Sequence, residues 1–218
     1  MSQSPISRAA APIALGAGAL VVITRLVIAL TTPPDAQALK AYVLTPAHAI
    51  NSVASILAFA LLAVALFGVY SREAREAGGM GVIALGAAVI GIVFMAGDWW
   101  YEAFAVPRIS EVAPEVLDTF VGGRLLIGGL SSFALFGIGC ALFGVASLRA
   151  RVFPAAVSIA ILASGLLSGV PIGVVYLSGE VILGLAIVWL GAWMLRTPPI
   201  ASAAVERAQH SPRFGRLT

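Results

Sequence analysis

The chain has 218 residues, of which 60% are hydrophobic and 11% are charged, and its mean hydropathy is +1.02. Soluble domains carry about 25% charged residues, so this composition excludes a soluble globular protein and indicates lipid as the solvent of most of the chain. The net charge of +3 is scattered over loops without a basic stripe, which argues against a nucleic-acid partner. The single cysteine, Cys140, excludes an intrachain disulfide and a cysteine-based metal cluster.

Apolar runs of the length needed to cross a bilayer, about 20 residues, recur six times along the chain. The predicted spans are 11–31, 45–70, 80–103, 124–147, 153–177 and 179–196. The first run is longer than the apolar part of a signal peptide, so we interpret it as a retained span. Residues 1–196 are therefore predicted to form one all-α domain, a bundle of six transmembrane helices. Residues 197–218, which include His210, form a basic tail that we expect to be disordered.

The distribution of Lys and Arg predicts the orientation, because cytoplasmic loops are enriched in positive charge. One side of the predicted bundle carries nine of these residues: Arg8, Arg72, Arg75, Arg149, Arg151, Arg196, Arg207, Arg213 and Arg216. The other side carries three, Lys40, Arg108 and Arg124. Both termini are therefore expected in the cytoplasm, and the expected location is the bacterial cytoplasmic membrane, with several crossings.

The long connection 104–123 is predicted to contain a short helix that lies on the membrane surface. Pro114 suits a first helical position and Glu115 the first turn. The apolar face of this helix would consist of Val116, Leu117, Phe120 and Val121.

Small residues in the fifth span recur at a spacing that favours close helix contact in lipid. Gly165, Gly169 and Gly173 are four residues apart. We expect this face to pack within the bundle, and a homodimer contact is the alternative. Pro171 is expected to kink the same span.

Polar and ionisable residues inside membrane spans are costly, so each one needs an explanation. At a rise of 1.5 Å per residue, those in the predicted spans all fall in the outer half of the bilayer, whereas the inner half contains no ionisable residue. The candidate ligand-binding set is Arg25, His48, Asn51, Asp98, Trp99, Tyr101, Glu102, Arg124, Tyr176 and Glu180. The outer half is therefore where the sequence predicts a site.

The spacing within this set is consistent with a shared site. Asp98 and Glu102 are four residues apart and share a helix face, and His48 and Asn51 are three apart and do the same. The aromatic run 99–101 lies between the two carboxylates, at the level where aromatic residues gather near membrane surfaces.

Four hypotheses account for the cluster. The first is a structural clamp, in which Arg25 pairs with Asp98 or Glu180. The second is an outward-facing pocket for a small or lipidic ligand. The third is a membrane-embedded acid–base enzyme, with Asp98, Glu102 and His48 as the catalytic candidates. The fourth is a metal site that would combine His48, Asp98 and Glu102, or a haem site, and a single histidine in the spans is a weak basis for either.

The stretch Leu-Phe-Gly-Ile-Gly-Cys-Ala-Leu-Phe-Gly-Val-Ala-Ser-Leu-Arg-Ala-Arg-Val-Phe-Pro (135–154) closes a span on basic residues and a proline. In this layout the chain resembles several uncharacterised families of small six-helix bacterial membrane proteins. The resemblance implies the six-helix architecture, and it implies no activity for the run Gly-Asp-Trp-Trp-Tyr-Glu (97–102). The residues thus predict a membrane protein, surrounded by membrane lipids, that binds a small or lipidic ligand or a membrane protein partner. The acid–base enzyme is the alternative, and no cofactor is identified.

Overall fold

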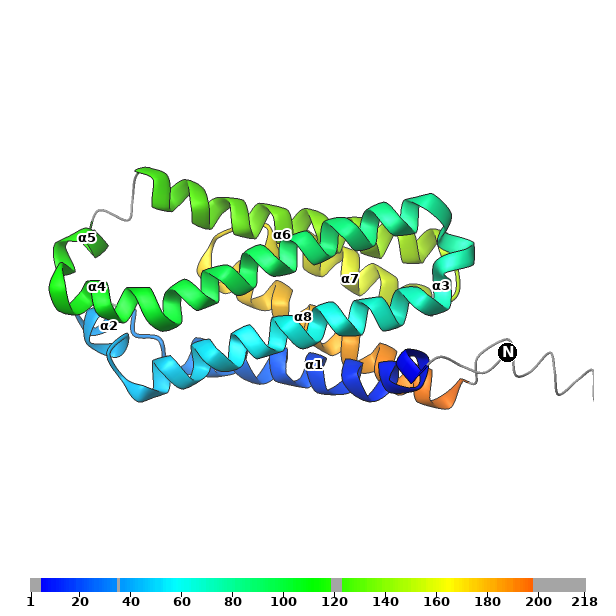
Figure 1. The fold of residues 1–218 in the computed structure, drawn as a ribbon, viewed down its shortest axis with the longest axis horizontal. Coiled ribbons are helices and arrows are strands. Elements are labelled where there is room, and N and C mark those ends of the chain that lie inside the picture. The colour runs from blue at the N-terminus through cyan, green and yellow to red at the C-terminus, as the bar shows by residue number, and fades with distance from the viewer. Residues whose placement is uncertain (1–4, 35, 119–122, 198–218) are drawn as a thin grey trace, which may run out of the picture.

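The computed structural model describes residues 5–34, 36–118 and 123–197, and every element in this part of the chain is a helix. Figure 1 shows the elements as α1 (Pro5–Thr31), α2 (Ala36–Tyr42), α3 (Pro46–Trp100), a π-helical turn (Tyr101–Ala105), α4 (Val106–Val112), α5 (Pro114–Asp118), α6 (Gly123–Ala150), α7 (Ala155–Ser168) and α8 (Gly173–Arg196). The predicted all-α class is confirmed. The tail that we expected to be disordered lies, from residue 198 on, outside the described residues.

Four helical segments are long and apolar enough to cross a membrane: Ala9–Thr31, Pro46–Val112, Leu126–Ala150 and Gly173–Arg196. Their outer surface is also apolar. Large hydrophobic side chains that are more than half exposed stand on all four segments, among them Ile23, Leu30, Ile50, Leu57, Ile83, Ile127 and Leu185. An exposed apolar surface of this extent is unfavourable in water and suits a lipid environment.

Gly78 divides α3 into two legs that lie side by side. Its backbone dihedral angles, φ 54° and ψ −147°, lie in a region that residues other than glycine rarely adopt. The chain therefore reverses at this glycine, and the second leg returns along the first, so that Gly81 contacts the ring of Tyr70 (Figure 1). We expected a connection over residues 71–79, whereas the helix continues on both sides of Gly78 and the turn itself is confined to this residue.

A second break separates α7 from α8 at residues 169–172. We expected one span over residues 153–177 and the next to begin at residue 179. These boundaries are wrong. Pro171 has no backbone N–H and disfavours a helical conformation at Val170, so it ends the helix instead of kinking it. As a result α7 is only 14 residues long, and α8 begins early, at Gly173.

The long helices close into a ring. The helix α3 packs against α1 and α6, α7 packs against α6 and α8, and α8 packs against α1. Gly165 and Gly169 of α7 meet the backbone of Gly137 on α6, so the predicted packing of this face within the bundle is confirmed for these two residues. Gly173, by contrast, faces open space.

The two ends of the bundle differ in structure. At one end, the α4 end (left in Figure 1), lie α2, α4 and α5. At the other, the Gly78 end, α3 reverses, α1 begins and α8 ends. The short helix predicted after residue 113 is present as α5 and starts at Pro114, while Phe120 and Val121 of its expected apolar face lie outside the described residues.

The Gly78 end also contains a buried carboxylate that the sequence analysis did not single out. Glu73 is fully buried, and Ser147 Oγ of α6 donates a hydrogen bond of 2.9 Å to its Oε1. Its neighbour Arg72 donates to the carbonyl oxygens of Met194 and Thr197 at the end of α8, at 3.3 and 3.2 Å. Buried charge is therefore not confined to the α4 end.

Candidate functional site

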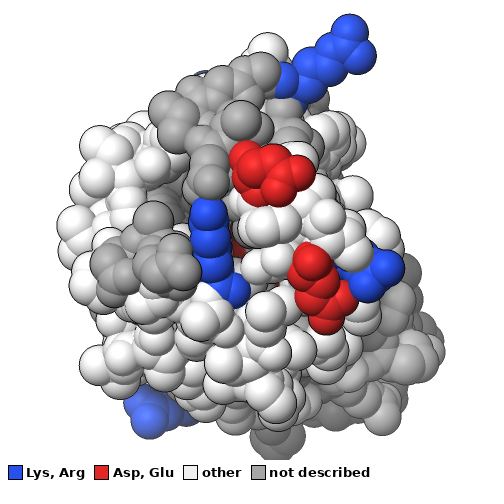
Figure 2. Space-filling view, turned by 90° about the vertical axis from the view of Figure 1, so that its left-hand side faces the viewer, with Lys and Arg blue, Asp and Glu red and all other residues white. Residues whose placement is uncertain are grey.

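A cavity of about 1030 Å³ opens at the α4 end of the bundle. Its walls come from α1, α2, both legs of α3, the π-helical turn, α4, α6, α8 and the break before α8. Figure 2 looks onto this end, where acidic and basic side chains surround a hollow and further acidic atoms lie inside it. Because α7 ends at Ser168, Pro171 and Tyr176 form part of the wall.

Most of the residues predicted from the sequence meet in this cavity. Eight of the ten line it: His48, Asn51, Asp98, Trp99, Tyr101, Glu102, Arg124 and Tyr176. The remaining two, Arg25 and Glu180, are buried and do not belong to its lining. The predicted cluster is therefore divided into a cavity and a separate ion pair.

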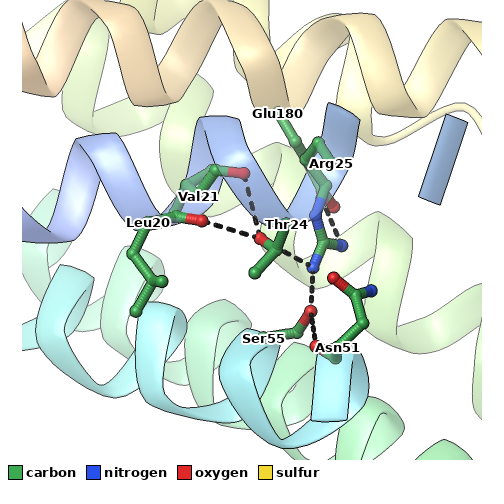
Figure 3. A network of polar contacts seen from close by, with 7 residues as sticks. All are labelled: Leu20, Val21, Thr24, Arg25, Asn51, Ser55 and Glu180. Carbon is green, nitrogen blue, oxygen red and sulfur yellow. Dashed lines mark hydrogen bonds and ion pairs between the residues drawn. The ribbon is translucent and has the colours of Figure 1, made fainter. Parts of the chain in front are cut away.

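The ion pair joins α1 to α8 inside the bundle (Figure 3). Arg25 Nη1 lies 2.8 Å from Glu180 Oε2, and both side chains are 1% exposed. The other guanidinium nitrogen, Nη2, donates to Ser55 Oγ, whose own hydroxyl donates to the Asn51 carbonyl oxygen at 2.8 Å. Of the two partners that the clamp hypothesis allowed for Arg25, the structure selects Glu180.

Trp99 touches both parts of the predicted cluster. Its ring lies against the guanidinium of Arg25, with 4.2 Å between Arg25 Cζ and the ring centroid, and it also lines the cavity. Such a contact is an attraction between the cation and the negative face of the indole. The ion pair therefore supports one wall of the cavity through this ring.

His48 is fixed by a carbonyl group that the π-helical turn leaves without a helical partner. In this turn the Val106 N–H donates to the Tyr101 carbonyl, five residues back. The next donor in the series would come from residue 107, which is a proline and has no N–H. The Glu102 carbonyl oxygen instead accepts from His48 Nε2 at 3.0 Å. Because a carbonyl oxygen only accepts, the Nε2 atom of His48 carries the proton.

Asp98 and Glu102 stand one helical turn apart on the second leg of α3 and the π-helical turn. Glu102 Oε2 is 3.8 Å from His48 Nε2. Asp98 forms no hydrogen bond or ion pair with any residue that the structure describes. The cavity thus contains two carboxylates, one of which has no partner in the described part of the chain.

Asn51 is another polar side chain in the wall that has no partner in the described part of the chain. The residue is 7% exposed and lines the cavity. Its backbone carbonyl is engaged by Ser55, but its carboxamide forms no hydrogen bond with the described residues (Figure 3). The carboxamide therefore borders the cavity with its hydrogen-bonding capacity available to whatever occupies the cavity.

Some residues of the site were not found from the sequence. Ser55 follows Asn51 by one helical turn, so the same spacing argument that joined His48 to Asn51 would have included it. Phe133 of α6 forms an edge-on contact with Tyr176 of α8, with 5.0 Å between the ring centroids. No local signal on α6 identifies Phe133, because its role depends on how α6 packs against α8.

A metal site is not supported by the geometry. Among residues 5–34, 36–118 and 123–197, no group of three or more His, Cys, Asp or Glu side chains is placed to hold a metal ion. This includes the combination of His48, Asp98 and Glu102 that the sequence suggested.

The fold and the cavity together define a class: over the described residues the protein is all-helical, with helices long and apolar enough to cross a membrane and a polar cavity open at one end. Comparisons with protein-family models, with curated proteins and with solved structures found no match.

Proposed function

We propose that this chain is a multi-pass protein of the bacterial cytoplasmic membrane that binds a small or lipidic ligand in the cavity at its α4 end. In this proposal six segments of the ring cross the membrane: α1, the two legs of α3, α6, α8, and α7 together with the break at residues 169–172, since the 14 residues of α7 alone rise only about 21 Å. Both termini are cytoplasmic, so the cavity opens on the outer side. The asymmetry of nine against three basic residues supports this orientation.

The observation that carries the proposal is the composition of the cavity wall. Ligand pockets are typically apolar, with a few polar groups that fix the orientation of the ligand, and have volumes of about 300–1,000 Å³. This cavity, at about 1030 Å³, combines apolar and aromatic side chains such as Ile28, Met95 and Phe133 with the carboxylates of Asp98 and Glu102.

Two glycines allow a test in which only the cavity is changed. Gly129 lines the cavity, and a Cβ atom there would meet nothing within 4 Å, so Gly129→Phe is expected to fill the cavity without disturbing the helix. Gly86 is equally open but lies outside the cavity, so Gly86→Phe is the matched control. Each variant is purified in dodecyl maltoside, and retained small molecules are identified by native mass spectrometry.

We expect the wild type and Gly86→Phe to retain the same compound and Gly129→Phe to lose it. Equal retention by all three proteins would place the ligand outside the cavity and would contradict the proposal. So would the absence of a bound compound from all three, after incubation of the folded proteins with a total membrane lipid extract.

The second candidate function is a membrane-embedded acid–base enzyme, favoured by the carboxylate of Asp98, which has no partner among the described residues, in a cavity that also contains His48 and Glu102. The proton on His48 Nε2 is engaged with a carbonyl oxygen, so this nitrogen is not available as a base. The proton would be transferred by the other ring nitrogen, Nδ1, or by one of the carboxylates, of which Asp98 has no partner among the described residues. An enzyme predicts that the wild type converts a bound lipid that Asp98→Asn binds but leaves unchanged in the mass spectrum.

A further inference from the structure

We infer that the ligand of this cavity is an organic cation, an amine with an apolar body, whose ammonium group lies against Asp98 and Glu102. This inference rests on the proposed function, because it names the ligand class for the same cavity. Three independent features support it: the charge of the deeper wall, the aromatic residues around it and the free carboxamide of Asn51.

The charge of the wall changes with depth. Asp98 precedes Glu102 by four residues on a leg that runs toward the α4 end, so it lies about 6 Å deeper. The basic residues of the lining are Lys40, on α2, and Arg124, which is exposed on the first turn of α6. The nearest buried cation, Arg25, is already paired with Glu180. The deeper wall is therefore acidic.

Two carboxylates in this position are stabilised by a counter-charge close to them. Like charges four residues apart on a helix repel each other, and an ionised carboxylate in a low-dielectric wall is unfavourable unless it is paired. Asp98 finds no cation among the residues that the structure describes. A ligand cation supplies the missing partner and would be held by charge-assisted hydrogen bonds.

The aromatic side chains favour an organic cation over a hydrated metal ion. Tyr176 and Phe133 stand together in the cavity wall, and Trp99 borders it. Aromatic rings attract ammonium groups and also provide apolar contact for the alkyl groups that such ions carry. The volume of about 1030 Å³ is far larger than an inorganic ion requires, and the described residues offer no metal-binding group.

Asn51 distinguishes among amines. The residue is more than nine-tenths buried, and its carboxamide has no hydrogen bond to the described part of the chain and is located in the wall. Its oxygen is an acceptor for an ammonium N–H, a group that a quaternary ammonium ion lacks. The arrangement thus fits a primary, secondary or tertiary amine better than a trimethylammonium group.

The test uses three probes with the same eight-carbon chain: octylamine, 1-octanol and octanoate. Binding to the protein in dodecyl maltoside at pH 7.5 is measured by isothermal titration calorimetry, with empty micelles as the blank. We expect octylamine to bind at least roughly tenfold more tightly than octanol, and octanoate to bind more weakly than either. Octyltrimethylammonium should bind more weakly than octylamine, because it cannot donate to Asn51.

Two isosteric variants locate the cation. Asp98→Asn and Glu102→Gln should each lower the affinity for octylamine by roughly tenfold or more and leave that for octanol within about twofold. Glu111→Gln is the matched control, because Glu111 is paired with Arg108 outside the cavity. The loss of the Glu111 charge should change neither the affinity for octylamine nor that for octanol. Melting temperatures in the same detergent verify that each variant is folded.

The outcomes separate this inference from the proposed function. If octanol and octylamine bind with equal affinity, or if neither Asp98→Asn nor Glu102→Gln weakens octylamine, the cation inference is wrong while the cavity still binds a ligand. If none of the probes binds, the cation inference is wrong, and the retention of a compound by the wild type and Gly86→Phe but not by Gly129→Phe still decides the proposed function. Added phosphatidylethanolamine identifies the source of the amine. If this lipid competes with octylamine, the ligand is a lipid headgroup; if it does not compete, the ligand is a free amine.

Discussion

At the scale of single residues, Arg25 and Glu180 form the contact whose loss should affect the bundle most. Both are buried, and the pair links the first and last long helices at 2.8 Å. Removing one partner of a buried pair costs about 3–5 kcal/mol, because the remaining charge stays buried without compensation. We therefore expect Arg25→Gln to lower the free energy of unfolding in dodecyl maltoside by about this amount, measured by denaturant titration.

An exposed pair provides the control for this prediction. Arg108 and Glu111 are also 2.9 Å apart but are mostly exposed, so Arg108→Gln should cost only about 0–1 kcal/mol. Replacement of both buried partners, Arg25→Met with Glu180→Leu, should recover most of the loss, since apolar residues of similar volume often replace a buried pair without cost. Equal unfolding free energies for Arg25→Gln and Arg108→Gln would contradict the clamp.

The sequence predicted the residue types of the site better than their partners. Helical spacing alone joined Asp98 to Glu102 and His48 to Asn51, because residues on one helix have a known geometry. The partner of Arg25 depends on the register between α1 and α8, which no one-dimensional pattern contains. For the same reason, the hydrogen bond from His48 to the Glu102 carbonyl was not predicted.

At the scale of elements, close backbone contact decides where two helices can meet. Gly18 of α1 lies against Gly184 of α8, and a Cβ atom on Gly18 would collide with the Gly184 carbonyl oxygen and the backbone of Val188. Gly16, two residues earlier on the same helix, has open space around it. Gly18 and Gly16 therefore allow the contact to be tested by the addition of one methyl group at each position.

We expect Gly18→Ala to separate α1 from α8 and to lower the melting temperature, with a cost of about 1–3 kcal/mol, as for overpacked cores. Gly16→Ala should be neutral or stabilise by up to about 1 kcal/mol, because alanine is the better helix former. The measurement is thermal unfolding in dodecyl maltoside. Identical melting temperatures for the two variants would mean that the helices do not approach closely at this point.

Helix boundaries could be predicted only where the sequence contains a strong local signal. Thr45 and Pro46 start α3 as expected, since the Thr45 hydroxyl accepts from the His48 N–H at 3.3 Å and proline suits the first turn. The end of α7 was misplaced because the chain stays apolar on both sides of Pro171, so composition does not distinguish a kink from a break. The π-helical turn was not predicted either, as its only local marker is Pro107.

At the scale of the whole molecule, composition was sufficient to predict a helical bundle with an apolar exterior. Nothing in the sequence, however, predicted that short α7 would leave a cavity at one end, because this depends on which helices the truncated one joins. The ring order places α7 between α6 and α8, so the wall residues Phe133 and Tyr176 come from its two neighbours. A site of this kind follows from the length of one helix and the packing of the others.

The orientation of the bundle has a direct test, because exposed positions exist at both ends. Val112 is 60% exposed at the α4 end and Glu76 is exposed next to Gly78. The native Cys140 is buried, so it should contribute little background labelling. In intact cells, a membrane-impermeant maleimide should label Val112→Cys, whereas Glu76→Cys should be labelled only after the membrane is permeabilised. The reverse pattern would place the cavity on the cytoplasmic side, and its ligand would then have to come from the cell interior.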